Sequence, residues 1–305
     1  MTSNAMGPGD LASKMIAEQG EKGITFNSLE DEPIGDSTSW LVYGGSKVGK
    51  TVFIGSAGPR TLIINIGDGI AVLQSQWAKE RFYKDGYPII TTIREERDRK
   101  TGIFTSADAF DKVADAIDIG VAKFGDRFDT IAVDDATQLR AFAMNKGLEV
   151  NADFNRSKTL EQARKGGGAF VPAVQDFGAE MDLIEQFIVG TISLCKQYSK
   201  HFILTAHERH IFKKIRDQTG KVVGEEIDKI RPAFTGKTFP DDVTGIFDLV
   251  WNFTAARTGQ GTVYRAYTED SMSIKAGTRF PGVFKSLEVN PNFLDAVRRI
   301  KASRK

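Results

Sequence analysis

The clearest chemical signal in this chain is a short glycine-rich segment that ends in a lysine and a threonine. It matches the phosphate-binding pattern G-x-x-x-x-G-K-[ST] with Gly44, Gly45, Ser46, Lys47, Val48, Gly49, Lys50 and Thr51. Because glycines lack a Cβ, backbone N–H groups at a helix N-terminus can approach phosphate oxygens closely. Lys50 would place a positive charge beside the terminal phosphates, and the Thr51 hydroxyl would ligate Mg²⁺. We therefore predict that these eight residues form a nucleotide site, in which Lys47 is a solvated loop charge.

The segments on either side of this loop are those that the pattern requires. Residues 40–43 are apolar and β-prone, and residues 51–57 can form a short helix. A strand, a loop and a helix in this order are the structural context of such nucleotide-binding loops. The alternative is a chance match, in which a glycine-rich turn only joins strand to helix, and these flanking segments argue against it.

Aspartates at the ends of predicted strands are the next candidates. Residues 129–133 form a short apolar run that is followed by Asp134 and Asp135. Because ligands bind at the carboxyl ends of parallel strands, we predict that Asp134 helps to hold Mg²⁺. Asp135 could orient the attacking water or cap the following helix. Asp68, after the apolar run at 60–66, is the other candidate base, unless it is only a turn residue between two glycines.

A histidine follows another apolar run. Residues 201–206 predict a buried strand that ends at His207. At that edge of the sheet the imidazole could sense the γ-phosphate, or it could be a hydrogen-bonded structural histidine. Both interpretations stay open, and His207 joins Lys50 among the candidate catalytic residues.

The elements that position these residues follow from the spacing of apolar side chains. Continuous apolar runs at 60–66 and 201–206 are typical of parallel strands buried on both faces. Apolar residues recur every three or four positions in 110–124, behind a capping pattern at 105–108, and again in 174–195. These patterns predict an α/β fold with a doubly wound, mostly parallel sheet flanked by helices.

Two basic segments are candidates for contact with nucleic acid. Residues 145–168 lack a periodic pattern and predict a flexible loop, in which Arg164 and Lys165 precede three glycines. Residues 211–223 predict a β-hairpin that carries Phe212 and the cations Lys213, Lys214, Arg216 and Lys221. Cations beside an aromatic ring suit phosphate contact and base stacking along a single strand. Alternatively, the loop is a solvated insertion, and the hairpin lysines only prevent edge-to-edge pairing.

Two further cations, Lys275 and Arg279, follow a short predicted strand near the C-terminus. Either cation could reach a nucleotide held by a neighbouring subunit, as arginine fingers do. The alternative is a surface pair without this role. We count Arg279 among the candidate catalytic residues.

Composition limits the classes to which the chain can belong. The 305 residues include 41 Lys+Arg and 40 Asp+Glu, so a nucleic-acid surface must come from local clustering. The single cysteine excludes an intrachain disulfide and suits the cytoplasm. No apolar run approaches a membrane span. We expect a flexible tail over 1–36, with a cloning remnant before Met6, and one domain over 37–305.

The order of the motifs resembles that of the phage RecA-like P-loop ATPases, also described as Sak-type single-strand annealing proteins. Besides the phosphate loop and the strand ending at Asp134, the matching segments are Gln175-Asp176-Phe177-Gly178, Thr205-Ala206-His207-Glu208-Arg209, Arg231-Pro232-Ala233-Phe234-Thr235-Gly236-Lys237, Phe247-Asp248 and 275–279. They span most of the chain from Ser39 to Arg279. The chain departs from the family at Asn65-Ile66-Gly67-Asp68, where the family has an acidic pair, and at Asp135, where it has a serine.

This resemblance implies a RecA-like core with a β-hairpin extension that binds ATP and Mg²⁺ and associates with single-stranded DNA. It also implies strand annealing or recombination beside a single-strand-binding protein, by a homo-oligomeric ring or filament in the cytoplasm of a bacterial host. We predict an ATPase that DNA stimulates. The alternatives are a P-loop phosphotransferase acting on small molecules such as nucleotides, and a DNA-binding scaffold that binds ATP without hydrolysing it.

Overall fold

The computed structural model describes residues 35–67, 69–100, 102–154, 156, 158–166, 171–259 and 261–304. The predicted tail at 1–36 lies outside this part of the chain, apart from its last two residues. The elements below belong to the unit Asp36–Lys305.

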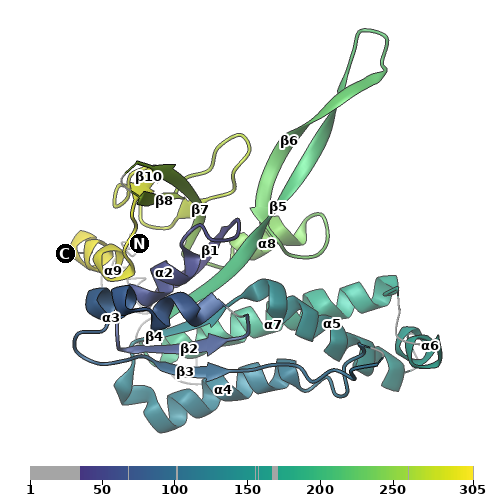
Figure 1. Ribbon diagram of the computed structural model, residues 1–305, viewed down its shortest axis with the longest axis horizontal. Coiled ribbons are helices and arrows are strands. Elements are labelled where there is room, and N and C mark those ends of the chain that lie inside the picture. Colours follow the sequence, from purple (N-terminus) through teal and green to yellow (C-terminus); the bar gives the residue numbers. More distant parts are fainter. Residues whose placement is uncertain are drawn as a thin grey trace, which may run out of the picture. The chain divides into compact units, whose positions relative to one another are not determined.

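A mostly parallel sheet forms the centre of this unit (Figure 1). Its strand order is β10-β8-β7-β1-β5-β4-β2-β3. The six strands from β7 to β3 are parallel, while β8 pairs antiparallel with β7 and β10 pairs antiparallel with β8. The doubly wound, mostly parallel sheet predicted from the sequence is thus confirmed. The strands are β1 (Ser39–Gly44), β2 (Thr61–Asn65), β3 (Ile89–Thr92), β4 (Thr130–Asp134), β5 (His201–Arg216), β7 (Leu249–Thr258), β8 (Gly261–Tyr267) and β10 (Leu287–Val289), with the short β9 (Gly277–Thr278) paired to β7.

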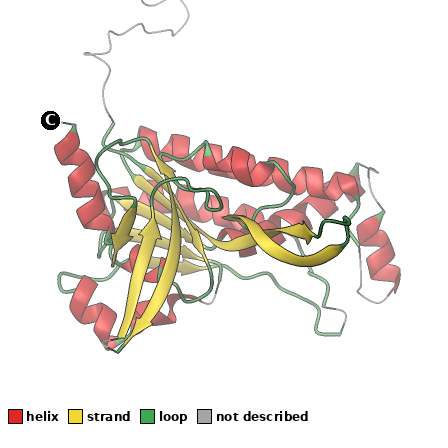
Figure 2. Ribbon diagram, turned by 90° about the horizontal axis from the view of Figure 1, so that it is seen from above, coloured by secondary structure: helices red, strands yellow, loops and turns green. Residues whose placement is uncertain are grey.

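Helices cover both faces of the sheet (Figure 2). One face packs against α4 (Ala109–Phe124), α5 (Ala136–Asp153), α7 (Val174–Gln197) and α8 (Phe239–Thr244). The other face packs against α2 (Lys50–Gly55), α3 (Gln76–Phe82), α9 (Phe293–Ser303) and the 3₁₀ turn η1 (Gly69–Gln74). A second 3₁₀ turn, η2 (Gly125–Arg127), follows α4. None of the helices in the described ranges is long and apolar enough to cross a membrane.

The alternating side chains of β1 explain why the sheet is buried on both faces. Leu41 belongs to the core under α4, α5 and α7, whereas Trp40 belongs to the core under α2 and α9. The Trp40 ring centroid lies 5.0 Å from that of Trp251 and 5.3 Å from that of Phe293. Such aromatic clusters bury a large apolar area, so they fix α9 and β7 against the strand that leads into the phosphate loop.

The predicted loop at 145–168 is the main error of the sequence analysis. The structure has helix there instead: α5 continues to Asp153, and α6 (Thr159–Gly166) follows. Buried Leu148 and Leu160 pack in a small separate core. The carboxylate of Asp176 also accepts hydrogen bonds from Asn151 Nδ2 and Thr159 Oγ1, both at 2.9 Å. These contacts join three helices, and the local sequence pattern does not reveal them.

The capping pattern predicted at 105–108 is also absent from α4. Asp108 is the N-cap residue, but its side chain makes no capping hydrogen bond. Its carboxylate instead lies 2.8 Å from Lys112 Nζ, and Thr105 Oγ1 donates to the Glu96 carbonyl at 3.2 Å. The helix begins where predicted because Phe110 and Val113 are buried, not because of its cap.

Strand β5 is longer than the sequence predicts. It continues beyond the sheet and forms a hairpin with β6 (Val222–Pro232), which extends away from the helices in Figure 1. Asp217 and Gly220 close the turn, where Gly220 has a φ of 83°. The predicted hairpin is therefore confirmed, and its root lies in the same strand as His207.

We predict that acid destabilises the fold through His201, the first residue of β5. This histidine is buried, and burial lowers its pKa to about 4 from an ordinary value of 6.5. Trp40 Nε1 donates to Thr38 Oγ1 at 2.7 Å, and that hydroxyl lies 2.8 Å from His201 Nδ1, so the neutral imidazole can accept from it. Because the unfolded chain takes up this proton first, stability falls from pH 6.5 to pH 4, by about 3 kcal/mol in total.

Urea unfolding at a series of pH values measures this effect. His201→Gln should remove much of the pH dependence between 6.5 and 4, whereas the exposed His210→Gln serves as a matched control that keeps it. An identical pH dependence in wild type and His201→Gln would contradict the assignment.

Candidate functional site

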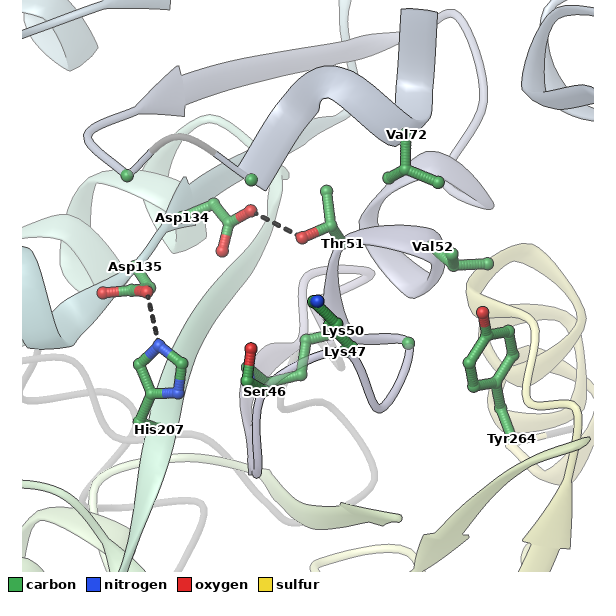
Figure 3. Close-up of a pocket in the computed structure, with 13 residues that line it drawn as sticks. Ser46, Lys47, Lys50, Thr51, Val52, Val72, Asp134, Asp135, His207 and Tyr264 are labelled. Carbon is green, nitrogen blue, oxygen red and sulfur yellow. Dashed lines mark hydrogen bonds and ion pairs between the residues drawn. The ribbon is translucent and has the colours of Figure 1, made fainter. Parts of the chain in front are cut away.

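A pocket of about 470 Å³ lies at the carboxyl ends of the parallel strands (Figure 3). Its walls come from the predicted phosphate loop, from the carboxyl end of β4, from β5 at the point where it leaves the central sheet, and from β8. The lining residues are Ser46, Lys47, Gly49, Lys50, Thr51, Val52, Gly67, Gly69, Val72, Asp134, Asp135, His207 and Tyr264. The structure therefore brings eight of the predicted residues into one cavity: Ser46, Lys47, Gly49, Lys50, Thr51, Asp134, Asp135 and His207.

The loop between β1 and α2 has the backbone that a phosphate cradle requires. Gly49 precedes the first residue of α2 with a φ of 98°, and Lys47 has a φ of 62°. A Cβ on Gly49 would lie 2.6 Å from Tyr264 Cδ1, closer than atoms can approach. Glycine is thus needed at this position for both its conformation and its size.

Lys50 lies inside this loop. Its side chain is buried, and Nζ donates to the carbonyls of Gly44 at 2.9 Å and Gly45 at 2.7 Å. Burial lowers the pKa of Lys50, and the charge of Asp134 acts against that shift. The ammonium group is therefore held by the loop itself, next to the space where the phosphates of a nucleotide would lie.

The carboxylate of Asp134 is held between two hydroxyl groups. Thr51 Oγ1 donates to Oδ2 at 2.9 Å, and Thr205 Oγ1 donates to Oδ1 at 2.5 Å. Burial raises the pKa of Asp134, while these two hydrogen bonds lower it. A Cβ on Gly69 would lie 3.1 Å from Asp134 Oδ2 and 3.2 Å from Thr51 Oγ1, so glycine leaves room beside both oxygens. Carboxylate and hydroxyl oxygens are ligands that suit Mg²⁺, and these residues fit that ion.

Asp135 is the helix cap that was one of its two predicted roles, and it also lies at the pocket. Its side chain caps α5 by accepting from Gln138 N at 2.9 Å, and it also lines the pocket. Its Oδ2 lies 3.4 Å from His207 Nε2, as Figure 3 shows. The backbone N–H of His207 donates to Thr137 Oγ1 at 3.2 Å. The start of α5 is thus linked to β5 at the point where both reach the pocket.

The other predicted residues lie elsewhere. Asp68 is outside the described residues, and Arg164 and Lys165 fall in the backbone of α6. Arg279 lines a different pocket of about 240 Å³ and lies 3.2 Å from Asp248, and Lys275 in the same pocket lies 2.9 Å from Asp270. The four hairpin cations do not line the pocket around Lys50; they are Lys213, Lys214, Arg216 and Lys221.

Thr205 and Tyr264 are among the residues that sequence analysis did not assign to the site. Thr205 could have been found, since it lies two residues before His207 in a strand and therefore on the same face. Tyr264 carries no such signal, because only the pairing of β8 with β7, and of β7 with β1, brings it beside the loop. In Figure 3 its ring lies near Val52, across Lys50 from Asp134.

Comparison with known proteins identifies one matching family. A family described as an AAA domain matches residues 36–280, a range that includes the phosphate loop, Asp134, His207 and Tyr264. The match agrees with the P-loop class expected from residues 44–51. No curated protein matches the chain.

We predict that Gly49→Ala damages the fold of the loop. The added methyl group would clash with the Tyr264 ring, and the φ of 98° at this position is unfavourable for alanine. The free energy of unfolding should therefore fall by about 1–3 kcal/mol. Gly190→Ala in α7 is the matched control, since a Cβ there meets no atom within 4 Å, and alanine should leave stability unchanged or raise it by up to about 1 kcal/mol. Urea unfolding measures both variants, and equal stabilities would contradict the steric argument.

Proposed function

The chain belongs to the AAA-domain family of P-loop ATPases, and on this basis we propose that it couples ATP hydrolysis to the binding of single-stranded DNA. One observation carries the proposal. Strand β5 places His207 at the pocket and Thr205 against the Asp134 carboxylate, and the same strand continues into the basic hairpin. A change at the nucleotide can therefore reach the hairpin through one continuous element.

Different residues around the pocket would bind the phosphates, the Mg²⁺ ion and the base of ATP. The loop amides and Lys50 hold the phosphates, and Thr51 and Asp134 would hold Mg²⁺, which supplies charge neutralisation between the phosphates. Lys50 Nζ has to exchange the carbonyls of Gly44 and Gly45 for phosphate oxygens. Tyr264 offers an aromatic surface to the base on the far side of the pocket.

Hydrolysis also requires a group that orients water. Asp135 has a carboxylate in the pocket and is not needed by the metal, so it is the described residue best placed to accept a hydrogen bond from that water. His207 fixes this carboxylate from the other side and would respond when the γ-phosphate leaves. Asp68 remains a candidate for the same role.

Contact with DNA is assigned to the cations beyond the pocket. Phe212 is 55% exposed on the hairpin, and Arg216 and Lys221 flank its turn. An exposed ring and cations suit base stacking and phosphate contact with a single strand. A homo-oligomer could bring Lys275 or Arg279 to a neighbouring nucleotide. Recombination or strand annealing beside a single-strand-binding protein is the process that this combination would serve.

A second candidate function rests on Asn65. This residue ends β2, where a catalytic carboxylate would face the nucleotide; its amide donates to Thr92 Oγ1 at 3.1 Å. An amide cannot act as a general base. A nucleotide-dependent scaffold that binds ATP and DNA without hydrolysis would have such a residue.

We predict that ATP hydrolysis rises with single-stranded DNA and depends on Lys50. Lys50→Ala removes the positive charge beside the phosphates, so the rate should fall about 100-fold or more, with or without DNA. The control is Lys123→Ala, an exposed residue of α4, which should hydrolyse ATP like wild type. A Lys50-dependent rate that DNA leaves unchanged would exclude the coupled function. ATP-dependent DNA binding without measurable hydrolysis would favour the scaffold.

We further predict that His207 links the nucleotide to DNA. In His207→Ala the contact with Asp135 is lost, so stimulation by DNA should fall about tenfold while ATP binding is retained. His207→Gln keeps a side chain that can donate to Asp135 and should recover part of the stimulation. ATPase rates and ATP-dependent DNA binding measure the effect. If His207→Ala leaves both unchanged, the link has no support.

A further inference from the structure

The outer part of the β5–β6 hairpin lacks the cover that other strands have. Among the described residues, β6 pairs only with β5, apart from a bridge between Ile230 and Ile274 at the root. Apolar side chains on the hairpin are exposed, including Phe212 at 55%, Val223 at 61% and Ile227 at 44%. A two-stranded ribbon alone is marginally stable in water, and its open edges can pair with another chain.

The two strands of this hairpin carry opposite charge. The exposed cations Lys213 and Lys214 lie on β5, and the acids Glu225, Glu226 and Asp228 lie on β6. The register places Lys213 opposite Glu226 and Lys214 opposite Glu225. The cations of β6, Lys229 and Arg231, lie nearer to the root. One long side of the ribbon is therefore basic and the other is mostly acidic.

The opposite charges of the two long sides favour a protein over a nucleic acid as their partner. A phosphate backbone along the ribbon would meet Glu225, Glu226 and Asp228, and like charges in contact disfavour binding. A second hairpin in the same orientation would instead place its acidic side against a basic side. The charges match in a head-to-tail arrangement, in which each copy uses a different side toward each neighbour.

We propose that the hairpins of successive copies lie side by side, with the basic β5 side of one copy against the acidic β6 side of the next. The partner of this surface is thus a second copy of the same chain. The apolar side chains Val223 and Ile227 of β6 gain cover from the neighbouring hairpin, and the turn cations Arg216 and Lys221 stay free of it. The arrangement goes beyond the proposed function and requires neither ATP hydrolysis nor DNA.

The ion pair inside one hairpin does not compete strongly with this contact. Lys213 Nζ lies 2.9 Å from Glu226 Oε1, but the two side chains are 58% and 52% exposed. Exposed pairs contribute little, so Lys213 and Glu226 can share their charge with groups of a neighbour at small cost. Because these charges face solvent, added salt should weaken the association.

Charge reversals on the full chain test this arrangement. The acidic-side variant Glu225→Lys with Glu226→Lys has two basic sides, and the basic-side variant Lys213→Glu with Lys214→Glu has two acidic sides. A fourfold variant that combines all four changes keeps its internal pairs but exchanges the sides. Sedimentation velocity over a range of protein concentrations measures association, without DNA, with and without ATP and Mg²⁺. Retained ATP binding shows that each core is folded.

The arrangement predicts a specific pattern of association. Each double variant alone should associate at least about tenfold more weakly than wild type, whereas an equimolar mixture of the two should recover, because opposite sides then meet. The fourfold variant should associate with itself like wild type, yet it should not join assemblies of fluorescently labelled wild type. Loss of internal hairpin pairing alone would not produce recovery in the mixture.

Three results would overturn the arrangement. Wild type could remain monomeric at all concentrations; the double variants could associate as strongly as wild type; or the fourfold variant could mix freely with wild type. If the basic-side variant loses DNA binding while its self-association is unchanged, nucleic acid and not a second copy occupies this side.

Discussion

Asp134 places a carboxylate in the interior of the protein, where a charge is costly unless polar groups surround it. Its two oxygens accept hydrogen bonds from Thr51 on α2 and Thr205 on β5, and Lys50 adds a positive charge nearby. Since the three elements β4, α2 and β5 each supply one of these groups, the carboxylate fixes their relative position. The shape of the pocket at the ends of these three elements depends on this arrangement.

Strand β5 extends this constraint from the pocket to the hairpin. His207 contacts Asp135, and two residues later Arg209 donates to the Gly236 carbonyl at 3.1 Å. Helix α5 also holds the segment after β6. Its Arg140 donates to Glu180 Oε1 at 2.7 Å and to the Ala233 carbonyl at 2.8 Å. Helix α5 therefore holds both the start of the hairpin and its end. A shift of α5 at its Asp135 cap would therefore also move the residues at the root of the hairpin.

Sequence patterns predicted the parts of the fold in which local signals agree with tertiary contacts. Residues 44–51 and the apolar runs before Asp134 and His207 placed the pocket correctly, because parallel strands must end at a common edge. The helices at 145–168 were missed, since contacts such as Asp176 to Thr159 stabilise them across the chain. Tyr264 was missed for the same reason, as only strand order places it beside Gly49. Long-range pairing is the information that a single sequence lacks.

The most direct test of this account is a structure of the full chain with Mg²⁺ and an ATP analogue that is not hydrolysed. We expect the phosphates to lie against the loop amides, with Lys50 Nζ on phosphate oxygens and no longer on the Gly44 and Gly45 carbonyls. Thr51 and Asp134 should both face the metal ion. A nucleotide bound elsewhere, or a Lys50 that keeps both carbonyl contacts, would contradict the account.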